Sequence, residues 1–276
     1  MTHVPNIALN DGVEIPQLGF GVFKVAAGET ERAVSTALEA GYRHVDTAAL
    51  YGNEREVGAA IAASGLPREE VFVTTKLWNS DQGDPSGALA ASLERLGLDH
   101  VDLYLIHWPV PSRDRYVDAW RGLEKIAAEG RARAIGVSNF QPAHLQRLID
   151  ETGTVPAINQ IELHPGFPQE RLRAYHAAHG IVTEAWGPLS QGGDALRDAR
   201  VRAVGERHGK TPAQVILRWH LQLGNVVIPK SVTPSRIAEN LDVFDFELGA
   251  EDLAVIDGLA TGRRLGPDPD TFAAGG

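Results

Sequence analysis

Short apolar segments alternate with amphipathic helical segments along most of this chain of 276 residues. Most of the apolar segments are continuous runs, which is typical of parallel strands covered on both faces. Eight such strand–helix units in a chain of this length predict an α/β fold, a (β/α)₈ barrel occupying residues 1–276 as one domain. The expected strands lie near residues 17–20, 43–46, 71–75, 101–106, 133–137, 157–161, 181–185 and 225–228.

Glycine marks the expected end of seven helical segments, and each glycine is followed within a few residues by an apolar segment. Glycine is favoured just past a helix because it adopts the left-handed backbone conformation without steric cost. Helix starts are predicted at Asp84-Pro85 and at Thr211-Pro212-Ala213-Gln214, the second of which forms a capping box. The seven glycines are Gly41, Gly65, Gly97, Gly130, Gly153, Gly180 and Gly224.

The two ends of the chain fall outside the strand–helix pattern. Residues 7–15 are expected to form a β-hairpin around Asp11-Gly12, which would close one mouth of the barrel. Residues 263–276 are rich in glycine, proline and aspartate, so we expect a C-terminal loop there. Phe272 in this loop would close one side of a substrate pocket.

Composition limits the classes of partner. The formal net charge is −10, which argues against binding nucleic acid or an anionic membrane through the overall field. No cysteine is present, so thiolate catalysis, disulfides and cysteine-bound metals are excluded. Residues 1–5 do not begin a secretory signal, and no apolar run approaches the ~18 residues of a membrane span. We therefore expect a cytoplasmic protein with a small-molecule partner.

Three polar residues occupy equivalent places at the ends of successive strands. Asp46 ends the second expected strand, Lys76 the third and His107 the fourth, and Tyr51 follows Asp46 by five residues. Catalytic groups of a (β/α)₈ barrel collect where strands end and the following loops begin. Each residue alone has an ordinary structural explanation, but their joint placement predicts an active site.

This set of side chains suits protonation of an oxyanion. A tyrosine with its usual pKa of ~10 is a poor acid at neutral pH unless its phenolate is favoured. We expect Lys76 to favour the phenolate of Tyr51, Asp46 to hold the lysine, and His107 to orient a substrate oxygen. Such a site fits reduction of a carbonyl by hydride transfer.

Two other interpretations, a doubly wound dinucleotide fold and a metal-dependent hydrolase, fit the sequence less well. A doubly wound dinucleotide fold needs G-x-G-x-x-G after its first strand, and Gly19-Phe20-Gly21 is followed by no third glycine at that spacing. A metal-dependent hydrolase is suggested by His44-x-Asp46, whose side chains would point the same way. The chain has no H-E-x-x-H motif and no clear facial triad, so no metal site is predicted.

The sequence resembles the aldo-keto reductase family over nearly its whole length. Residues 41–58, 135–140 and 228–240 resemble three long family signatures, the first containing Asp46, Glu54 and Gly58. Within the family, the chain is similar to the bacterial 2,5-diketo-D-gluconate reductase branch. The stretches that carry this similarity are 51–54, 75–79, 159–165 and 240–246.

The resemblance implies that Asp46, Tyr51, Lys76 and His107 form a catalytic tetrad without a metal. Tyr51 would be the general acid in reduction, and reduced nicotinamide would supply the hydride. The resemblance also implies an NADPH-dependent reductase of aldehydes, ketones or α-dicarbonyls, including 2,5-diketo-D-gluconate, and a monomer. A cofactor-sensing regulatory protein on the same fold remains the alternative.

The expected cofactor site follows strands five to eight. Ser138, Asn139 and Gln160 can bond a carboxamide, as the matching family positions do, and Trp186 could stack on the nicotinamide ring. A glycine-containing loop after strand seven allows close approach of a pyrophosphate. A basic and hydroxyl cluster suits a 2′-phosphate and predicts a preference for NADPH. These two segments comprise Gly187, Pro188, Leu189, Ser190, Gln191 and Gly192, and Lys230, Ser231, Val232, Thr233 and Arg236, with Glu239 and Asn240 added by the resemblance.

Aromatic side chains are expected to form the substrate pocket. Phe23, Trp78 and Trp108 follow strands one, three and four, so they would surround His107 with apolar walls. Asn139 could add a hydrogen-bond donor. We see no cation that would dictate a carboxylated substrate, so assignment to a sugar acid depends on the resemblance alone.

Overall fold

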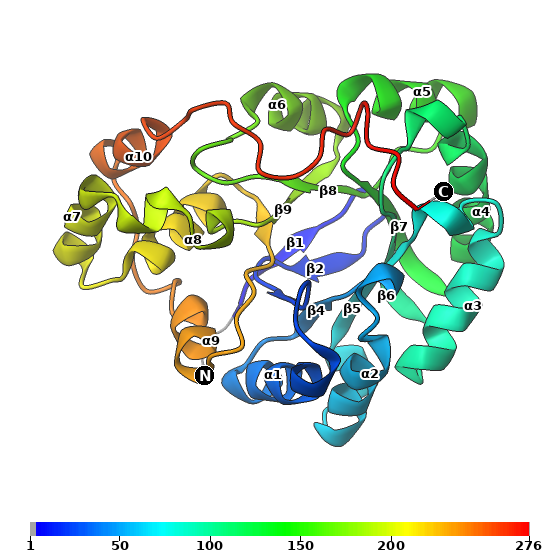
Figure 1. The fold of residues 1–276 in the computed structure, drawn as a ribbon, viewed down its shortest axis with the longest axis horizontal. Coiled ribbons are helices and arrows are strands. Elements are labelled where there is room, and N and C mark those ends of the chain that lie inside the picture. The colour runs from blue at the N-terminus through cyan, green and yellow to red at the C-terminus, as the bar shows by residue number, and fades with distance from the viewer. Residues whose placement is uncertain (1–3, 276) are drawn as a thin grey trace.

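The computed structural model describes residues 4–275, in which eight parallel strands form a closed sheet surrounded by helices (Figure 1). Neighbours in the sheet are neighbours in the sequence. A parallel bridge between Leu18 and Val227 joins its first and last strands, and Gly19 N donates to Val227 O at 2.8 Å. The strands are β3 (Phe20–Gly21), β4 (His44–Asp46), β5 (Phe72–Leu77), β6 (Val101–Ile106), β7 (Ala132–Ser138), β8 (Ile158–Glu162), β9 (Val182–Trp186) and β10 (Val226–Val227). The predicted (β/α)₈ barrel is therefore confirmed.

Helices cover the outside of the barrel, but they do not alternate strictly with the strands. Two helices follow β9 and two follow β10, which differs from the expected single helix after each strand. Apolar residues of the strands and helices pack together in a continuous core that includes Trp120 and Trp219. The helices are α1 (Ala27–Ala40), α2 (Glu54–Ala63), α3 (Pro85–Leu96), α4 (Tyr116–Ala128), α5 (Pro142–Thr152), α6 (Glu170–His179), α7 (Ala199–His208), α8 (Pro212–Gln222), α9 (Pro234–Leu241) and α10 (Ala250–Asp257).

The predicted signals for the starts and for the ends of helices are both confirmed. All seven glycines adopt a positive φ, between 66° at Gly97 and 116° at Gly41. Asp84 accepts a hydrogen bond from Gly87 N, and Thr211 and Gln214 form a reciprocal capping box. Among the described residues, no helix is long and apolar enough to cross a membrane.

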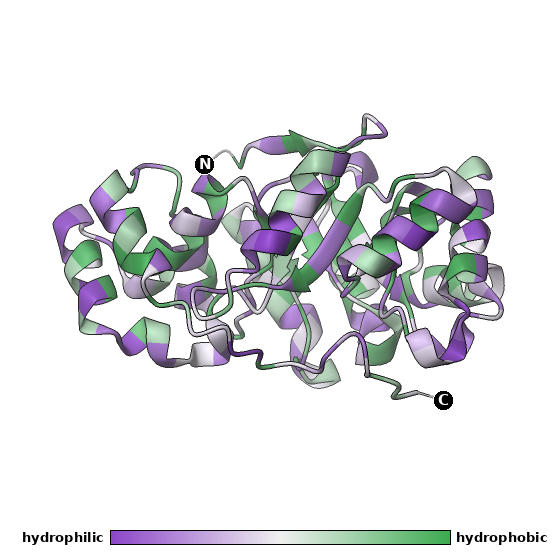
Figure 2. Cartoon of the chain, turned by 90° about the horizontal axis from the view of Figure 1, so that it is seen from above, coloured by the Kyte–Doolittle hydropathy of each residue, from purple (hydrophilic) through white to green (hydrophobic). Residues whose placement is uncertain are grey.

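The N-terminal hairpin lies at the end of the barrel where the strands begin. Strands β1 (Asn6–Ala8) and β2 (Glu14–Pro16) pair antiparallel around the turn at Asp11 and Gly12, as predicted. Leu9 and Ile15 are buried in a cluster with Leu103 and other strand residues, so the hairpin plugs this mouth. Figure 2 shows the hairpin on the opposite side of the molecule from the C-terminal segment.

The C-terminal segment, residues 261–275, crosses the other mouth, and we call it the strap (Figure 1, orange to red). Its described residues form no regular helix or strand, as expected for a loop. The buried carboxylate of Glu162 accepts hydrogen bonds from Leu265 N at 2.6 Å and Gly266 N at 2.9 Å. Further along, Asn79 Nδ2 donates to Ala274 O at 2.9 Å. Thr261 N also donates to Gly166 O, and Asp270 lies 3.4 Å from His144 Nε2, so the strap is attached to the barrel at several points along its length.

Gly58→Ala is expected to destabilise the protein, because α2 approaches α3 too closely for a side chain there. A Cβ at Gly58 would lie 2.0 Å from Leu96 O, a backbone atom that can move only with its helix. Overpacking of this kind costs about 1–3 kcal/mol, which urea denaturation would measure. Gly28→Ala in α1 is the matched control, since a Cβ there meets nothing within 4 Å. Equal stability of the two variants would contradict the predicted crowding.

Candidate active site

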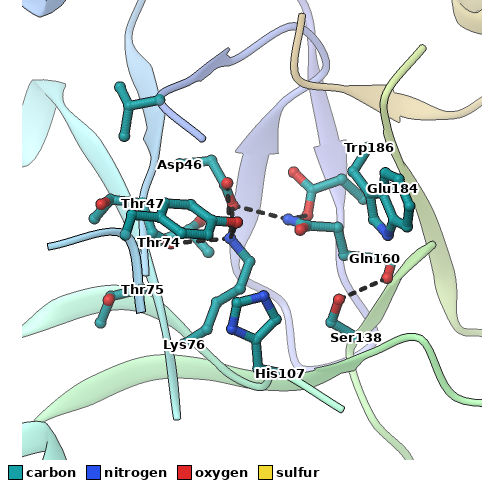
Figure 3. Close-up of polar contacts among 12 residues, drawn as sticks. Asp46, Thr47, Thr74, Thr75, Lys76, His107, Ser138, Gln160, Glu184 and Trp186 are labelled. Carbon is teal, nitrogen blue, oxygen red and sulfur yellow. Dashed lines mark hydrogen bonds and ion pairs between the residues drawn. The ribbon is translucent and has the colours of Figure 1, made fainter. Parts of the chain in front are cut away.

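Asp46, Lys76 and His107 lie together at the C-terminal end of the barrel (Figure 3). Asp46 is the last residue of β4, Lys76 the penultimate residue of β5, and His107 directly follows β6. Tyr51 ends a short 3₁₀ turn, Ala49–Tyr51, in the loop after β4. The parallel strands bring these ends to one edge, so the structure assembles the four residues as the sequence predicts.

Lys76 is the centre of the arrangement. Its Nζ lies 2.7 Å and 2.8 Å from the two oxygens of Asp46 and 2.9 Å from Thr47 O. The lysine is fully buried and Asp46 is 1% exposed, so the ion pair is shielded from solvent. Burial is the largest single effect and lowers the pKa of Lys76, but the charge and hydrogen bond of Asp46, together with smaller effects of Tyr51 and Glu184, outweigh burial and the pKa is raised. Lys76 is therefore a fixed ammonium at neutral pH.

The Tyr51 hydroxyl completes this chain of contacts at 3.4 Å from Lys76 Nζ. Desolvation raises the pKa of Tyr51 to about 12, while the Lys76 ammonium acts in the opposite direction. The prediction that the lysine makes this phenol more acidic than usual is wrong in net direction, because burial outweighs the ammonium. The phenol consequently keeps its proton throughout the neutral range and has the ammonium ready beside it if the proton leaves.

The loop that carries Tyr51 is tied to the barrel by its next two polar side chains. Asn53 Nδ2 donates to Val22 O at 3.1 Å, and its Oδ1 accepts from Thr47 at 3.0 Å. Glu54 accepts from Thr75 Oγ1 and from Arg95 Nε, each at 2.6 Å. These hydrogen bonds fix the position of Tyr51 relative to the C-terminal ends of the strands.

His107 is a neutral hydrogen-bonding group in this structure. Burial, with a smaller contribution from the Lys76 ammonium, lowers its pKa well below the usual value. Its Nδ1 is buried and has no hydrogen-bond partner among the described residues. The imidazole ring meets Tyr51 edge-on, with 5.8 Å between ring centroids. A neutral imidazole in this place can bond a substrate oxygen without adding a charge.

The residues predicted to contact a carboxamide lie across the mouth from Tyr51. Ser138 Oγ donates to Gln160 O at 2.8 Å, and Asn139 Nδ2 donates to His107 O at 3.0 Å. Trp186 Nε1 donates to Asn139 Oδ1 at 2.8 Å. Asn139 adopts a φ of 64°, a left-handed conformation that asparagine tolerates better than most residues. Its two bonds connect the ends of β6, β7 and β9.

The loop after β9 has the backbone shape expected of a segment that approaches a ligand closely. Gly187, Ser190, Gln191 and Gly192 all have positive φ values, between 52° and 83°. Ser190–Gly192 forms a short 3₁₀ turn. The N–H groups of Ser190 and Gly192 donate to carbonyl groups of the same loop, at 2.9 Å and 3.0 Å, so the turn is closed by its own backbone bonds. Pro188 and Leu189 lie between these residues and are part of the same loop.

The predicted basic cluster follows β10. Lys230, Thr233 and Arg236 are exposed, and neither cation forms an ion pair with another residue in the range 4–275. Ser231 Oγ accepts from Thr233 N at 3.1 Å, and Val232 packs against the core. Glu239 accepts from Thr211 Oγ1 at 2.7 Å, and Asn240 is 5% exposed. Two exposed cations without carboxylate partners remain available to an anionic group.

The aromatic residues surround the tetrad in pairs. Phe23 lies beside Tyr51, with 5.0 Å between ring centroids, and Trp78 lies beside His107 at 5.1 Å. Trp108 packs on Phe272 of the strap at 4.4 Å. Phe23 is 47% exposed, as expected of a residue at the rim of an open pocket. The structure thus brings all the predicted wall residues to the mouth that contains the tetrad.

Two buried carboxylates near the site were not predicted. Glu184 lies inside the barrel on β9, and Glu162 on β8 binds both the strap and His164 Nε2. Both are fully or almost fully buried. A charged residue inside an apolar strand of a parallel sheet was the available signal, because such a residue needs a specific partner.

The metal-dependent alternative gains no support from the arrangement of ligands. No group of three or more histidine and carboxylate side chains in the described part of the chain is placed to hold an ion. His44 Nε2 instead contacts Thr74 Oγ1 at 3.1 Å, and burial lowers the pKa of His44 to about 4.

Comparisons with known proteins agree with this geometry. The model of the Aldo/keto reductase family matches residues 17–261. An aldo-keto reductase of Mycolicibacterium smegmatis is 60% identical over 97% of this chain and 98% of its own length. Methylglyoxal reductase DkgA of Yersinia pestis is 55% identical over 99% of both chains.

Similarity extends to solved structures. A mutant of the protein Gox0644, solved in complex with NADPH, superposes with a TM-score of 0.94 and 46% identity, covering 98% of this chain and 99% of its own. The matches extend over almost the entire barrel, including the strand ends that hold Asp46, Lys76 and His107. The chain therefore belongs to the aldo/keto reductase family.

Proposed function

We propose that this protein reduces small aldehydes, ketones and α-dicarbonyls to alcohols with NADPH, and that Tyr51 is the proton donor. The observation that carries the proposal is the buried chain of contacts from Asp46 through Lys76 to the Tyr51 hydroxyl. The similarity to proteins named methylglyoxal reductase supports α-dicarbonyls as the substrate class. A 2,5-diketo sugar acid is a member of the same chemical class.

The described residues fit a dinucleotide of this kind. Gln160, Ser138 and Asn139 place amide and hydroxyl groups around the mouth, and Trp186 offers an indole face. The exposed Lys230 and Arg236 suit a 2′-phosphate, with Glu239 and Asn240 beside them for the adenosine end. The loop from Gly187 to Gly192 has the backbone shape to pass near the pyrophosphate. When bound, reduced nicotinamide would supply the hydride.

The side chains of the tetrad would then divide the remaining work. His107 and Tyr51 bond the carbonyl oxygen of the substrate and fix its direction. As negative charge develops on that oxygen, the Tyr51 hydroxyl gives it a proton, and the alcohol forms. The resulting phenolate is stabilised by the Lys76 ammonium 3.4 Å away and regains its proton from water. The aromatic walls formed by Phe23, Trp78, Trp108 and Phe272 limit the access of water during transfer of the proton to the substrate, and water reaches the phenolate after the alcohol leaves.

The direct test is oxidation of NADPH by purified protein, measured against methylglyoxal, 2,5-diketo-D-gluconate, simple sugars and aromatic aldehydes. We expect turnover with at least one α-dicarbonyl, and the alcohol product identified in stoichiometric amount. Tight binding of NADPH without turnover of any carbonyl would refute the proposal and favour a regulatory role.

Arg236→Ala is expected to reduce kcat/KM with NADPH by about ten- to a hundredfold, because a charge-assisted hydrogen bond to the 2′-phosphate is lost. Values with NADH should change little, so the ratio of NADPH to NADH kcat/KM falls. Arg32→Ala on α1 is the matched control, since this arginine is also exposed and lies outside the proposed site. An unchanged ratio in the Arg236 variant would contradict the assignment of this cluster.

A further inference from the structure

Glu184 has a carboxyl group in the interior of the barrel, beside Gln160 and to one side of Asp46 (Figure 3). Its exposed fraction is 0%, and its Oε2 accepts a hydrogen bond from Gln160 Nε2 at 2.9 Å. The same nitrogen donates to Asp46 Oδ2 at 2.8 Å. Gln160 thus bridges two carboxyl groups, and one of them, Asp46, holds Lys76.

These two contacts determine which way the Gln160 amide faces. An amide nitrogen has two hydrogens, and here each is directed at one carboxylate. Turning the amide over would place its oxygen against the Asp46 carboxylate, with acceptor facing acceptor, and would remove the donor from Glu184 Oε2. The Oε1 atom of Gln160 is left without a donor among the described residues. It can therefore accept a hydrogen bond from an N–H of a carboxamide.

We propose that Glu184 is a positioning residue that fixes the direction of the Gln160 amide and thereby the pose of the nicotinamide carboxamide. The inference rests on the proposed function, because it needs a nicotinamide cofactor at the mouth. With Asp46 alone, one amide hydrogen would have no partner, and the side chain could rotate about its terminal bond. With both carboxylates present, the acceptor oxygen is held in one direction before the cofactor arrives.

The groups that face Glu184 decide its charge. They are His44 and Asp46 on β4, Lys76 on β5 and Gln160 on β8. Burial and the nearby Asp46 carboxylate raise the pKa of Glu184 to about 8, against the smaller effects of Gln160 and Lys76. Its second oxygen, Oε1, has no hydrogen-bond partner among residues 4–275 and lies 3.9 Å from His44 Nε2. Glu184 therefore holds a proton at neutral pH while its Oε2 still accepts from Gln160.

Loss of the Glu184 proton would change the pKa of Tyr51. Above about pH 8 a second negative charge appears beside Asp46, and the charge of Glu184 acts to raise the pKa of Tyr51. A weaker acid transfers its proton less readily, so reduction slows. The buried carboxyl pair would thus set an upper limit to the working pH range without touching substrate.

The amide direction is tested by Glu184→Leu, with binding as the readout. We expect the Kd for NADPH to rise about tenfold, because the nicotinamide carboxamide loses one well-oriented hydrogen bond to Gln160. The Kd for 2′,5′-ADP should stay within twofold of the wild-type value. The fragment 2′,5′-ADP has the phosphate and adenine parts but no nicotinamide, so it reports whether the rest of the site is intact. An unchanged Kd for NADPH, or equal weakening of both ligands, would overturn the positioning role.

The variant E184Q tests whether the Glu184 carboxyl group carries a proton at neutral pH. Its side chain keeps an oxygen acceptor for the Gln160 amide but cannot ionise. We expect kcat/KM for carbonyl reduction by the wild type to fall through a step centred near pH 8, and this step to be absent in E184Q. E162Q is the matched control, because Glu162 is also buried at this mouth but its pKa is lowered rather than raised. The step is expected to persist in E162Q. Its persistence in E184Q would overturn the assignment to Glu184.

Thermal unfolding tests the buried proton of Glu184 independently of the proposed function, because the measurement needs no turnover. Glu184 has a raised pKa in the folded state, so folding takes up a proton between the unfolded value near 4.5 and about pH 8. Wild-type stability therefore decreases across this range as pH rises. We expect the Tm of E184Q relative to wild type to increase from pH 5 to pH 8 and then level off. A difference that is constant with pH would refute the buried proton even in a protein that proves inactive.

Discussion

Tyr51→Phe is expected to fold normally and bind NADPH, while its kcat for carbonyl reduction falls about a thousandfold. Phenylalanine fills the same space but has no proton to give, and the only hydrogen bond the described structure gives this hydroxyl is the 3.4 Å contact with Lys76. Stability should change by less than about 1 kcal/mol, because one long contact to a buried ammonium is lost. Stopped-flow or steady-state oxidation of NADPH with methylglyoxal measures the effect on kcat.

The matched control for this variant is Tyr175→Phe. Tyr175 lies on α6, and its hydroxyl donates to Gln146 at 3.0 Å on the outside of the barrel. We expect its kcat to equal that of the wild type. If Tyr51→Phe retained a kcat within tenfold of wild type, another group would have to supply the proton, and Tyr51 would lose its proposed role.

Lys76→Met is expected to abolish measurable turnover and also to destabilise the protein by about 3–5 kcal/mol. Removal of the ammonium leaves the Asp46 carboxylate buried without its cation, and it removes the charge that stabilises a Tyr51 phenolate. The loss of stability and the loss of turnover have different causes, so they can be separated. Urea denaturation measures the change in stability, and kcat at several pH values measures the change in turnover.

The double variant Asp46→Asn with Lys76→Met makes the separation. It removes both charges of the buried pair, so stability should recover by several kcal/mol relative to Lys76→Met alone. Activity should not recover, because no ammonium remains beside Tyr51. Recovery of turnover in the double variant would show that Lys76 serves the structure rather than the proton transfer.

The barrel could be predicted because its signals are local. Continuous apolar strands, glycines at helix ends and the capping residues at Asp84 and Thr211 each act within a few positions of the chain. The convergence of Asp46, Lys76 and His107 could also be predicted, since parallel strands bring their C-terminal ends to one edge. The extra helices after β9 and β10 were missed, as the expected pattern assigned one helix to each strand.

The acidity of Tyr51 could not be predicted from neighbouring residues. The sequence shows that a lysine approaches the tyrosine, but it does not show how much water the fold removes from the hydroxyl. Desolvation proves larger than the charge of Lys76. The bridge from Asp46 to Glu184 was missed for a similar reason: Gln160 and Glu184 are paired on neighbouring strands, but only closure of the sheet brings Asp46 on β4 within reach of the Gln160 amide.

The attachment of the strap has a practical consequence for handling the protein. Gly266 lies so close to Trp186 that a Cβ there would be 2.6 Å from the indole, and Phe272 forms part of the opposite wall. A group attached at the C-terminus that displaces the strap would therefore also displace the indole of Trp186 and the pocket wall at Phe272. Immobilisation on a resin through the hairpin end would leave the catalytic mouth facing the solution. Anchoring through the C-terminus would place the support directly over that mouth.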